Sequence, residues 1–186
     1  EVGGTVGDFE GGPFLEALRQ MQYERGTENT TFVHVTWFAH VGATNELKTK
    51  PSQHSLRELR SFGIIPDVVV ARADYPIAQE LCVKLAHFSH IPPSQVFPLP
   101  TEKVTYRVPL VLEEKGLGAL LCKRLALANG DQRTDWSKWK SFIKSVEAPS
   151  HKKLTIGLVG KYVQLHDAYI SVTEALQHAG KQMDAD

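Results

Sequence analysis

The sequence predicts an α/β fold in which a Rossmann-like parallel sheet is flanked by helices. Short apolar runs alternate with longer amphipathic stretches, which is the pattern of consecutive βα units. Residues 67–72 include the run Val-Val-Val-Ala, which is typical of a strand buried on both faces. Prolines at expected helix starts and glycines at expected helix ends separate these segments.

The elements up to residue 125 follow from local composition. Pro13 is expected to begin a helix that ends at Gly26, and Pro51 is expected to begin a second helix. Residues 31–37 alternate and are rich in β-branched and aromatic residues, so they predict a strand. The other predicted elements are strands at 67–72 and 96–99 and helices at 77–88, 110–115 and 117–125.

After residue 125 the composition changes. Thr134 or Asp135 can cap a helix that carries an aromatic stripe, which we interpret as packing rather than as a base-stacking site. The βα pattern then restarts with a predicted strand at 154–160 and a predicted helix at 167–178. We therefore expect a partial first domain over residues 1–128, a linker with an amphipathic helix over 129–153, and a truncated second domain over 154–186.

Bulk composition limits the function classes. The 186 residues are 42% hydrophobic and 23% charged, with a formal net charge of zero, so no overall basic field favours nucleic acid as a partner. Cys82 and Cys122 are far apart in the sequence, which predicts reduced thiols rather than a disulfide framework. No signal peptide or membrane-spanning run is recognisable, so we expect a cytoplasmic protein without a membrane partner.

Residues 1–10 hold three glycines and three carboxylates. Glycine lets the backbone approach a ligand closely, and carboxylates are ligands suited to Mg²⁺. The segment therefore suggests metal–nucleotide binding, with a tight turn of solvated acids as the alternative. It is not a Walker A loop, and the Gly-x-x-x-x-Gly-Lys-Ser/Thr pattern occurs nowhere in the sequence.

Residues 48–54 form a second candidate segment. Pro51 biases Lys50 towards extended geometry, so Lys48 and Lys50 are expected to project to the same side. Pro51 also favours the first position of a helix, and a helix N-terminus attracts phosphate. The combination suggests a triphosphate site, and the alternative is a solvated basic loop.

Taken together, these motifs resemble the CTP synthase family. The matching segments, in the family's order and spacing, are residues 1–10, 13–20, 47–55, 63–67, 106–109 and 157–162. The resemblance implies a P-loop amidoligase (synthetase) fold, followed by the first βα unit of a class I glutamine amidotransferase domain. It also implies that the P-loop unit precedes these residues and that the Cys-His-Glu glutaminase triad follows them.

The resemblance further implies an activity and a set of site residues. The family aminates UTP to CTP with ATP, Mg²⁺ and glutamine or ammonia through 4-phosphorylated UTP, is activated by GTP, and forms homotetramers. Carried over position by position, the Mg²⁺ ligand is Glu1, the UTP/CTP-binding residues are Asp8, Phe9, Glu10, Lys48, Thr49, Lys50, Pro51, Ser52, Gln53 and Lys84, and the ATP-binding residues are Pro100, Thr101 and Glu102.

Several segments depart from the family pattern. Residues 100–102 do so at the expected ATP contact, and Phe9, Gly11 and Gly12 do so beside the expected pyrimidine contact. No catalytic residue is assignable within the sequence, and we expect these 186 residues alone to be inactive. The alternatives are a non-catalytic nucleotide-binding or oligomerisation module, and a truncated chain that does not fold stably.

Overall fold

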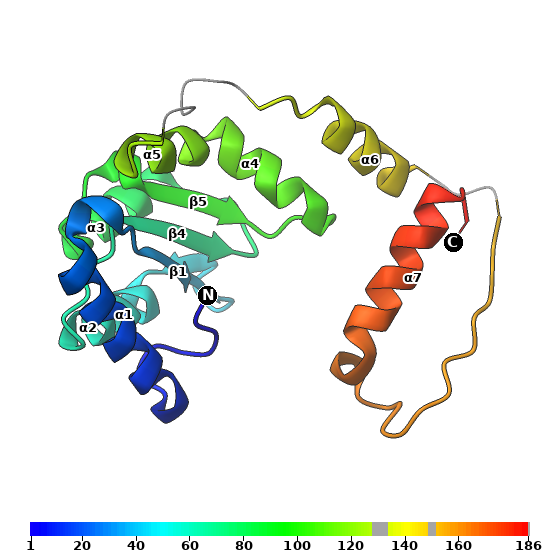
Figure 1. The fold of residues 1–186 in the computed structure, drawn as a ribbon, viewed down its shortest axis with the longest axis horizontal. Helices are drawn as coiled ribbons and strands as arrows, with labels where there is room; N and C mark the ends of the chain where they lie inside the picture. Colours follow the sequence, from blue (N-terminus) through cyan, green and yellow to red (C-terminus); the bar gives the residue numbers. More distant parts are fainter. Residues whose placement is uncertain (128–133, 149–151, 186) are drawn as a thin grey trace. The chain divides into compact units, whose positions relative to one another are not determined.

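The computed structural model describes residues 1–127, 134–148 and 152–185 (Figure 1). They belong to two compact units, Glu1–Arg133 (unit 1) and Thr134–Asp186 (unit 2). Unit 1 contains a parallel sheet with flanking helices, which confirms the predicted α/β class. In the described part of the chain, no helix has the length and apolarity needed to cross a bilayer.

The parallel sheet is built from three strands at the predicted positions. They are β1 (Val33–Trp37), β4 (Val68–Ala73) and β5 (Val96–Pro100), in the spatial order β1-β4-β5 (Figure 1). Both pairings are parallel. The run of four apolar residues therefore forms the central strand, where burial on both faces favours such a composition.

Helices cover both faces of β4. Val69 and Ala71 pack in one cluster with Leu56 of α2 (Lys50–Ser61) and with Leu85 of α3 (Gln79–Ser89). Successive residues of a strand point to opposite faces. Val68 and Val70 accordingly point to the other face and belong to another cluster, which includes residues of α4 (Val108–Glu114) and α5 (Leu117–Arg124).

A third cluster lies beside the sheet. Leu15 of α1 (Gly12–Arg25) packs with Leu59 and Ile64. Helix α1 ends at Gly26, as predicted, and this glycine has a φ of 87° that suits a residue without a Cβ. The 3₁₀ helices of unit 1 are η1 (Phe9–Gly11), η2 (Thr27–Asn29), η3 (Pro93–Gln95) and η4 (Thr105–Arg107).

An ion pair joins the start of the sheet to α5. Asp67, just before β4, accepts a hydrogen bond from the backbone N–H of Phe32 at 2.8 Å and pairs with Arg124. The Asp67 side chain is 14% exposed and that of Arg124 33%. The pair therefore connects the segment before β1, the start of β4 and the last turn of α5.

A two-stranded antiparallel hairpin was not predicted. Strands β2 (Ala39–Val41) and β3 (Glu46–Lys48) pair directly after β1 and lead into α2. Each strand has only three residues, too few for an alternating pattern to be recognised in the sequence.

The start of α2 also differs from the expectation. The helix begins at Lys50, so Lys50 is helical rather than extended and Pro51 occupies its second position. The N–H of Gln53 donates to the Thr49 carbonyl at 2.9 Å and closes the first turn. Proline is tolerated in this turn because its missing N–H has no intrahelical acceptor there.

Unit 2 is helical. It contains α6 (Ser137–Glu147), η5 (His166–Tyr169) and α7 (Ile170–Gln182). The N-cap of α6 is Trp136 rather than the predicted Thr134 or Asp135, although the Asp135 carboxylate accepts a hydrogen bond from the backbone N–H of Ser137 at 2.9 Å. Phe142 of α6 packs edge-on against His178 of α7 with ring centroids 5.8 Å apart, which supports packing as the role of the aromatic stripe.

The strand predicted at residues 154–160 is wrong, because no strand is assigned there. A parallel strand forms only by pairing with a neighbouring strand. Within the described residues of unit 2, the one β-bridge joins Lys152 to Ala185, and the apolar side chains of Leu154 and Ile156 are exposed. Residues 128–133 and 149–151 lie outside the described residues; they include residues 129–133 and 149–151 of the predicted linker and the last residue of the predicted first domain.

Candidate functional site

The candidate segments follow the carboxyl ends of the parallel strands. The hairpin and the start of α2 come after β1, and residues 100–102 come at the end of β5. Open α/β sheets bind ligands beyond the carboxyl ends of their strands. The fold therefore places residues 48–53 and 100–102 at the edge of the sheet where a nucleotide site is expected.

The lysine-rich segment joins the hairpin to α2. Lys48 ends β3 opposite Ala39 and is half-buried, Thr49 is 4% exposed, and Lys50 is exposed. The Gln53 side-chain amide donates to the Thr49 hydroxyl at 3.1 Å. No side chain caps the N-terminus of α2. The unpaired N–H groups of its first turn therefore add a partial positive charge to that of the lysines.

Two serines one turn apart attach α2 to β1. The hydroxyl of Ser52, which is fully buried, donates to the Trp37 carbonyl at 2.8 Å. The Ser55 hydroxyl lies 3.1 Å from Nε2 of His34. Because the Ser52 hydroxyl proton is already donated and the residue has no exposed surface, Ser52 positions the helix and does not contact a ligand.

His34 is the buried ionisable group of this junction. Its side chain is on β1 and is 7% exposed. Burial lowers its pKa to about 4 from the ordinary 6.5, because a charged imidazole would lose its hydration there. His34 is therefore neutral at pH 7.

Lys48 and Lys84 lie close to one carboxylate. Lys48 donates from Nζ to Oε1 of Glu46, and both side chains are about half exposed, at 45% and 50%. The hydrogen bond from Lys48 is the main cause of a lowered Glu46 pKa, and Thr44 and the charge of Lys84 lower it further. Lys48 therefore pairs with Glu46 directly, whereas Lys84 of α3 acts on it only through its charge.

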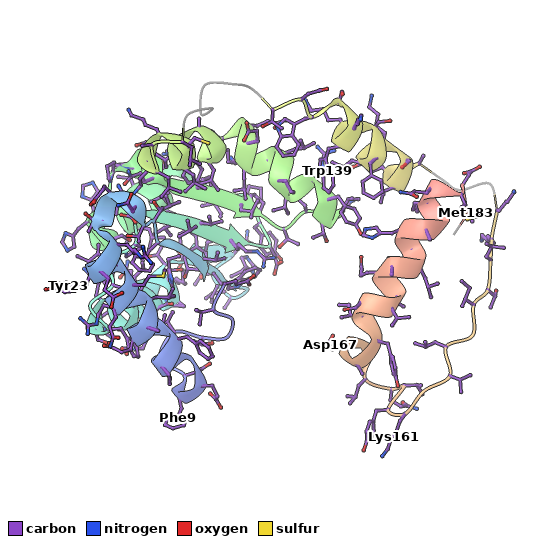
Figure 2. All side chains as sticks on the ribbon, viewed as in Figure 1. Phe9, Tyr23, Trp139, Lys161, Asp167 and Met183 are labelled. Atoms are coloured by element: carbon purple, nitrogen blue, oxygen red, sulfur yellow. The ribbon has the colours of Figure 1, made fainter. Side chains whose placement is uncertain are left out.

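The glycine-rich segment makes local contacts and runs beside α2. The Asp8 carboxylate accepts a hydrogen bond from the Thr5 N–H at 2.9 Å and closes a turn. Gly7 has a φ of 104°, and a Cβ there would lie 3.9 Å from the Glu58 side chain. Phe9 is 93% exposed and points away from the fold (Figure 2), and Glu10 is also exposed.

Comparison with known proteins shows the family to which the chain belongs. Residues 1–127 match the family model described as CTP synthase N-terminus. The chain belongs to the CTP synthase family. A CTP synthase of Roseiflexus sp. (strain RS-1) is 54% identical over all 186 residues, and one of Methanocaldococcus jannaschii is 47% identical over 184. The chain spans about a third of the length of each relative, at 33% and 34%.

Glu1 is the metal ligand that the family resemblance implies. It lines a groove of about 1160 Å³ that runs along β1 and also includes Thr36, Trp37 and Ser55. In the described residues, no three His, Cys, Asp or Glu side chains gather as a metal site. An exposed carboxylate fits the habit of Mg²⁺, which binds one or two carboxylates and completes its shell with water and phosphate oxygens.

The proposed ATP-binding segment is held by the ends of β4 and β5. The backbone N–H of Thr101 donates to the Ala73 carbonyl at 2.8 Å, and the Thr101 hydroxyl donates to the Asp74 carboxylate at 2.9 Å. Glu102 pairs with Arg107 at 3.5 Å. These contacts therefore fix residues 101 and 102 at the edge of the sheet.

Sequence reasoning missed Glu46, His34 and Ser55. The alternation of β1 predicts the opposite of this burial, because the apolar residues of the strand are exposed whereas His34 and Thr36 are buried. Glu46 and Lys48 are two residues apart in β3 and so lie on the same face of the strand, and that spacing was a usable signal for their ion pair.

Proposed function

We propose that this chain supplies the pyrimidine-nucleotide site of an enzyme that aminates UTP to CTP. The reaction consumes ATP, takes nitrogen from glutamine or ammonia and passes through 4-phosphorylated UTP. The supporting observation is that Lys48 and Lys50 lie at the uncapped start of α2, and that the charge of Lys84 acts on the carboxylate with which Lys48 pairs. Ammonium groups and free N–H groups complement the charge of a triphosphate.

The remaining site residues divide between metal and ATP. Glu1 would hold Mg²⁺, which when bound neutralises charge on the transferring phosphoryl group. Pro100, Thr101 and Glu102 would contact ATP, and the carboxyl ends of the strands are a suitable place for it. Asp8, Phe9 and Glu10 would contact the pyrimidine nucleotide, with the exposed ring of Phe9 available to a ligand or a neighbouring subunit.

The further properties of the family are part of the proposal. Residues 154–186 would begin the glutamine amidotransferase domain, and the relatives' similarity extends over this segment. We also propose that the intact protein forms a homotetramer, is activated by GTP and is located in the cytoplasm. Because phosphoryl transfer depends on positioned phosphate-binding groups and no Walker A pattern occurs here, we expect the isolated chain to bind without turnover.

Binding of UTP to the 186-residue chain tests this proposal. We expect measurable UTP and CTP binding by calorimetry, with no CTP formed from UTP, ATP and ammonia. Replacing Lys84 with Met should weaken UTP binding about fivefold to thirtyfold, the effect of losing one charge-assisted contact. Lys123→Met, on the exposed side of α5, is the matched control and should leave binding unchanged.

The outcomes separate the alternatives. Absence of UTP binding, or equal effects of Lys84→Met and Lys123→Met, would reject the proposed site. Formation of CTP by the isolated chain would contradict the expectation that it is inactive. A non-catalytic oligomerisation module would instead show a shift in size-exclusion chromatography on addition of CTP and Mg²⁺.

A further inference from the structure

The hairpin holds a carboxylate where the proposed phosphate site has its lysines. Glu46 begins β3 opposite Val41, two residues before Lys48. The turn before it is closed by the Thr44 N–H, which donates to the Val41 carbonyl at 3.2 Å, and Asn45 adopts a left-handed φ of 50°. The carboxylate is thus presented by a short, hydrogen-bonded turn.

One cation pairs with this carboxylate. Lys48 donates to Glu46 directly, and the charge of Lys84 acts on it without a direct contact. The proposed function assigns Lys48 to the nucleotide phosphates, so the inference rests on that proposal. A carboxylate paired with an ammonium group makes the same kind of charge-assisted contact that a phosphate oxygen would make.

We propose that Glu46 is an internal counter-anion that competes with nucleotide phosphate for Lys48 and so lowers the affinity of the site. Phosphate can bind this lysine only if the carboxylate gives up its hydrogen bond, because two anions close together repel each other. The pair is half exposed and therefore weak. A triphosphate also reaches Lys50 and the N–H groups of α2, which Glu46 does not occupy, so it displaces the carboxylate more readily than a monophosphate does.

The Glu46→Gln variant tests the competition. The amide keeps the size of the side chain and removes its charge. Glu46 is exposed, so the variant should fold as the wild type does, and a thermal unfolding curve checks this. In low salt, the dissociation constants of UTP and inorganic triphosphate should fall about two- to fivefold, the range that an exposed ion pair supports. The gain should shrink at high salt because exposed charges are screened.

Two comparisons make the result specific. Glu24→Gln, on the exposed surface of α1, changes the net charge equally and should leave both dissociation constants unchanged. In a Lys48→Met background, Glu46→Gln should give a smaller gain, because the main partner of the carboxylate is gone.

The outcomes distinguish this inference from the proposed function. UTP binding that is equal or weaker in Glu46→Gln than in the wild type, or an equal gain in Glu24→Gln, would overturn the counter-anion role and leave the site in place. Absence of UTP and triphosphate binding in both the wild type and Glu46→Gln would overturn both proposals.

Discussion

The two units of the chain contain similar apolar runs but use them differently. In unit 1, residues 68–71 form the central strand of a sheet and are at most 4% exposed. In unit 2, residues 154–160 form no strand, and Leu154, Ile156 and Leu158 are 59%, 60% and 42% exposed. The difference teaches that a strand-like run becomes a strand only where a neighbouring strand pairs with its backbone.

The largest expected effect compares one leucine from each unit. Leu85→Ala in α3 removes a side chain with no exposed surface, which should lower the free energy of unfolding of unit 1 by about 2–5 kcal/mol. Leu154→Ala in unit 2 should change stability by less than about 0.5 kcal/mol because the side chain is already hydrated. Urea unfolding measures both. Equal losses would mean that residue 154 belongs to a core.

Burial of His34 in unit 1 should make the free energy of unfolding depend on pH. The unfolded chain binds a proton at His34 as the pH falls below 6.5, whereas the folded chain resists until about pH 4. Stability should therefore be level above pH 6.5, fall between pH 6.5 and 4 by on the order of 3 kcal/mol, and level off below.

His34→Gln isolates the contribution of this residue. The variant should flatten that part of the profile of unfolding free energy against pH, whatever its effect at pH 7. A slope unchanged by the substitution would assign the acid sensitivity to other groups.

The smallest effect compares two serine hydroxyls that donate to backbone carbonyls. Ser52 donates to Trp37 at 2.8 Å in the buried junction of unit 1, and Ser145 donates to Phe142 at 2.7 Å on the exposed surface of α6. Ser52→Ala should cost about 1–2 kcal/mol because it leaves a carbonyl without its partner, and Ser145→Ala should cost less because water replaces the hydroxyl. Similar costs, by thermal or urea unfolding, would show that burial does not matter here.

Much of unit 1 was predictable from local patterns. The apolar composition of β4, the alternation of β1, and the positions of Pro13 and Gly26 each express a rule that acts within a few residues. The motifs at residues 1–10 and 47–55 were also sufficient to predict the family. Their identification required no knowledge of which side chains meet in space.

The candidate site was only partly predictable. Lys48 and Lys84 could be named from the resemblance, but the buried hydroxyl of Ser52 and the carboxylate of Glu46 depend on contacts with β1 and α3. The expected extended geometry of Lys50 failed because a backbone hydrogen bond extended the helix by one residue.

The sequence by itself therefore determined the order of the three parallel strands and the α-helices in unit 1, the family, and the residue types available to bind phosphate. Only the tertiary structure decided that residues 154–160 remain without strand pairing, that Ser52 faces β1, and that Glu46 lies with Lys48 and near Lys84. The physical reason is the sequence separation over which each kind of interaction acts. Propensity and patterning act between neighbours in the chain, whereas strand pairing, burial and charge contacts act between residues that the fold brings together.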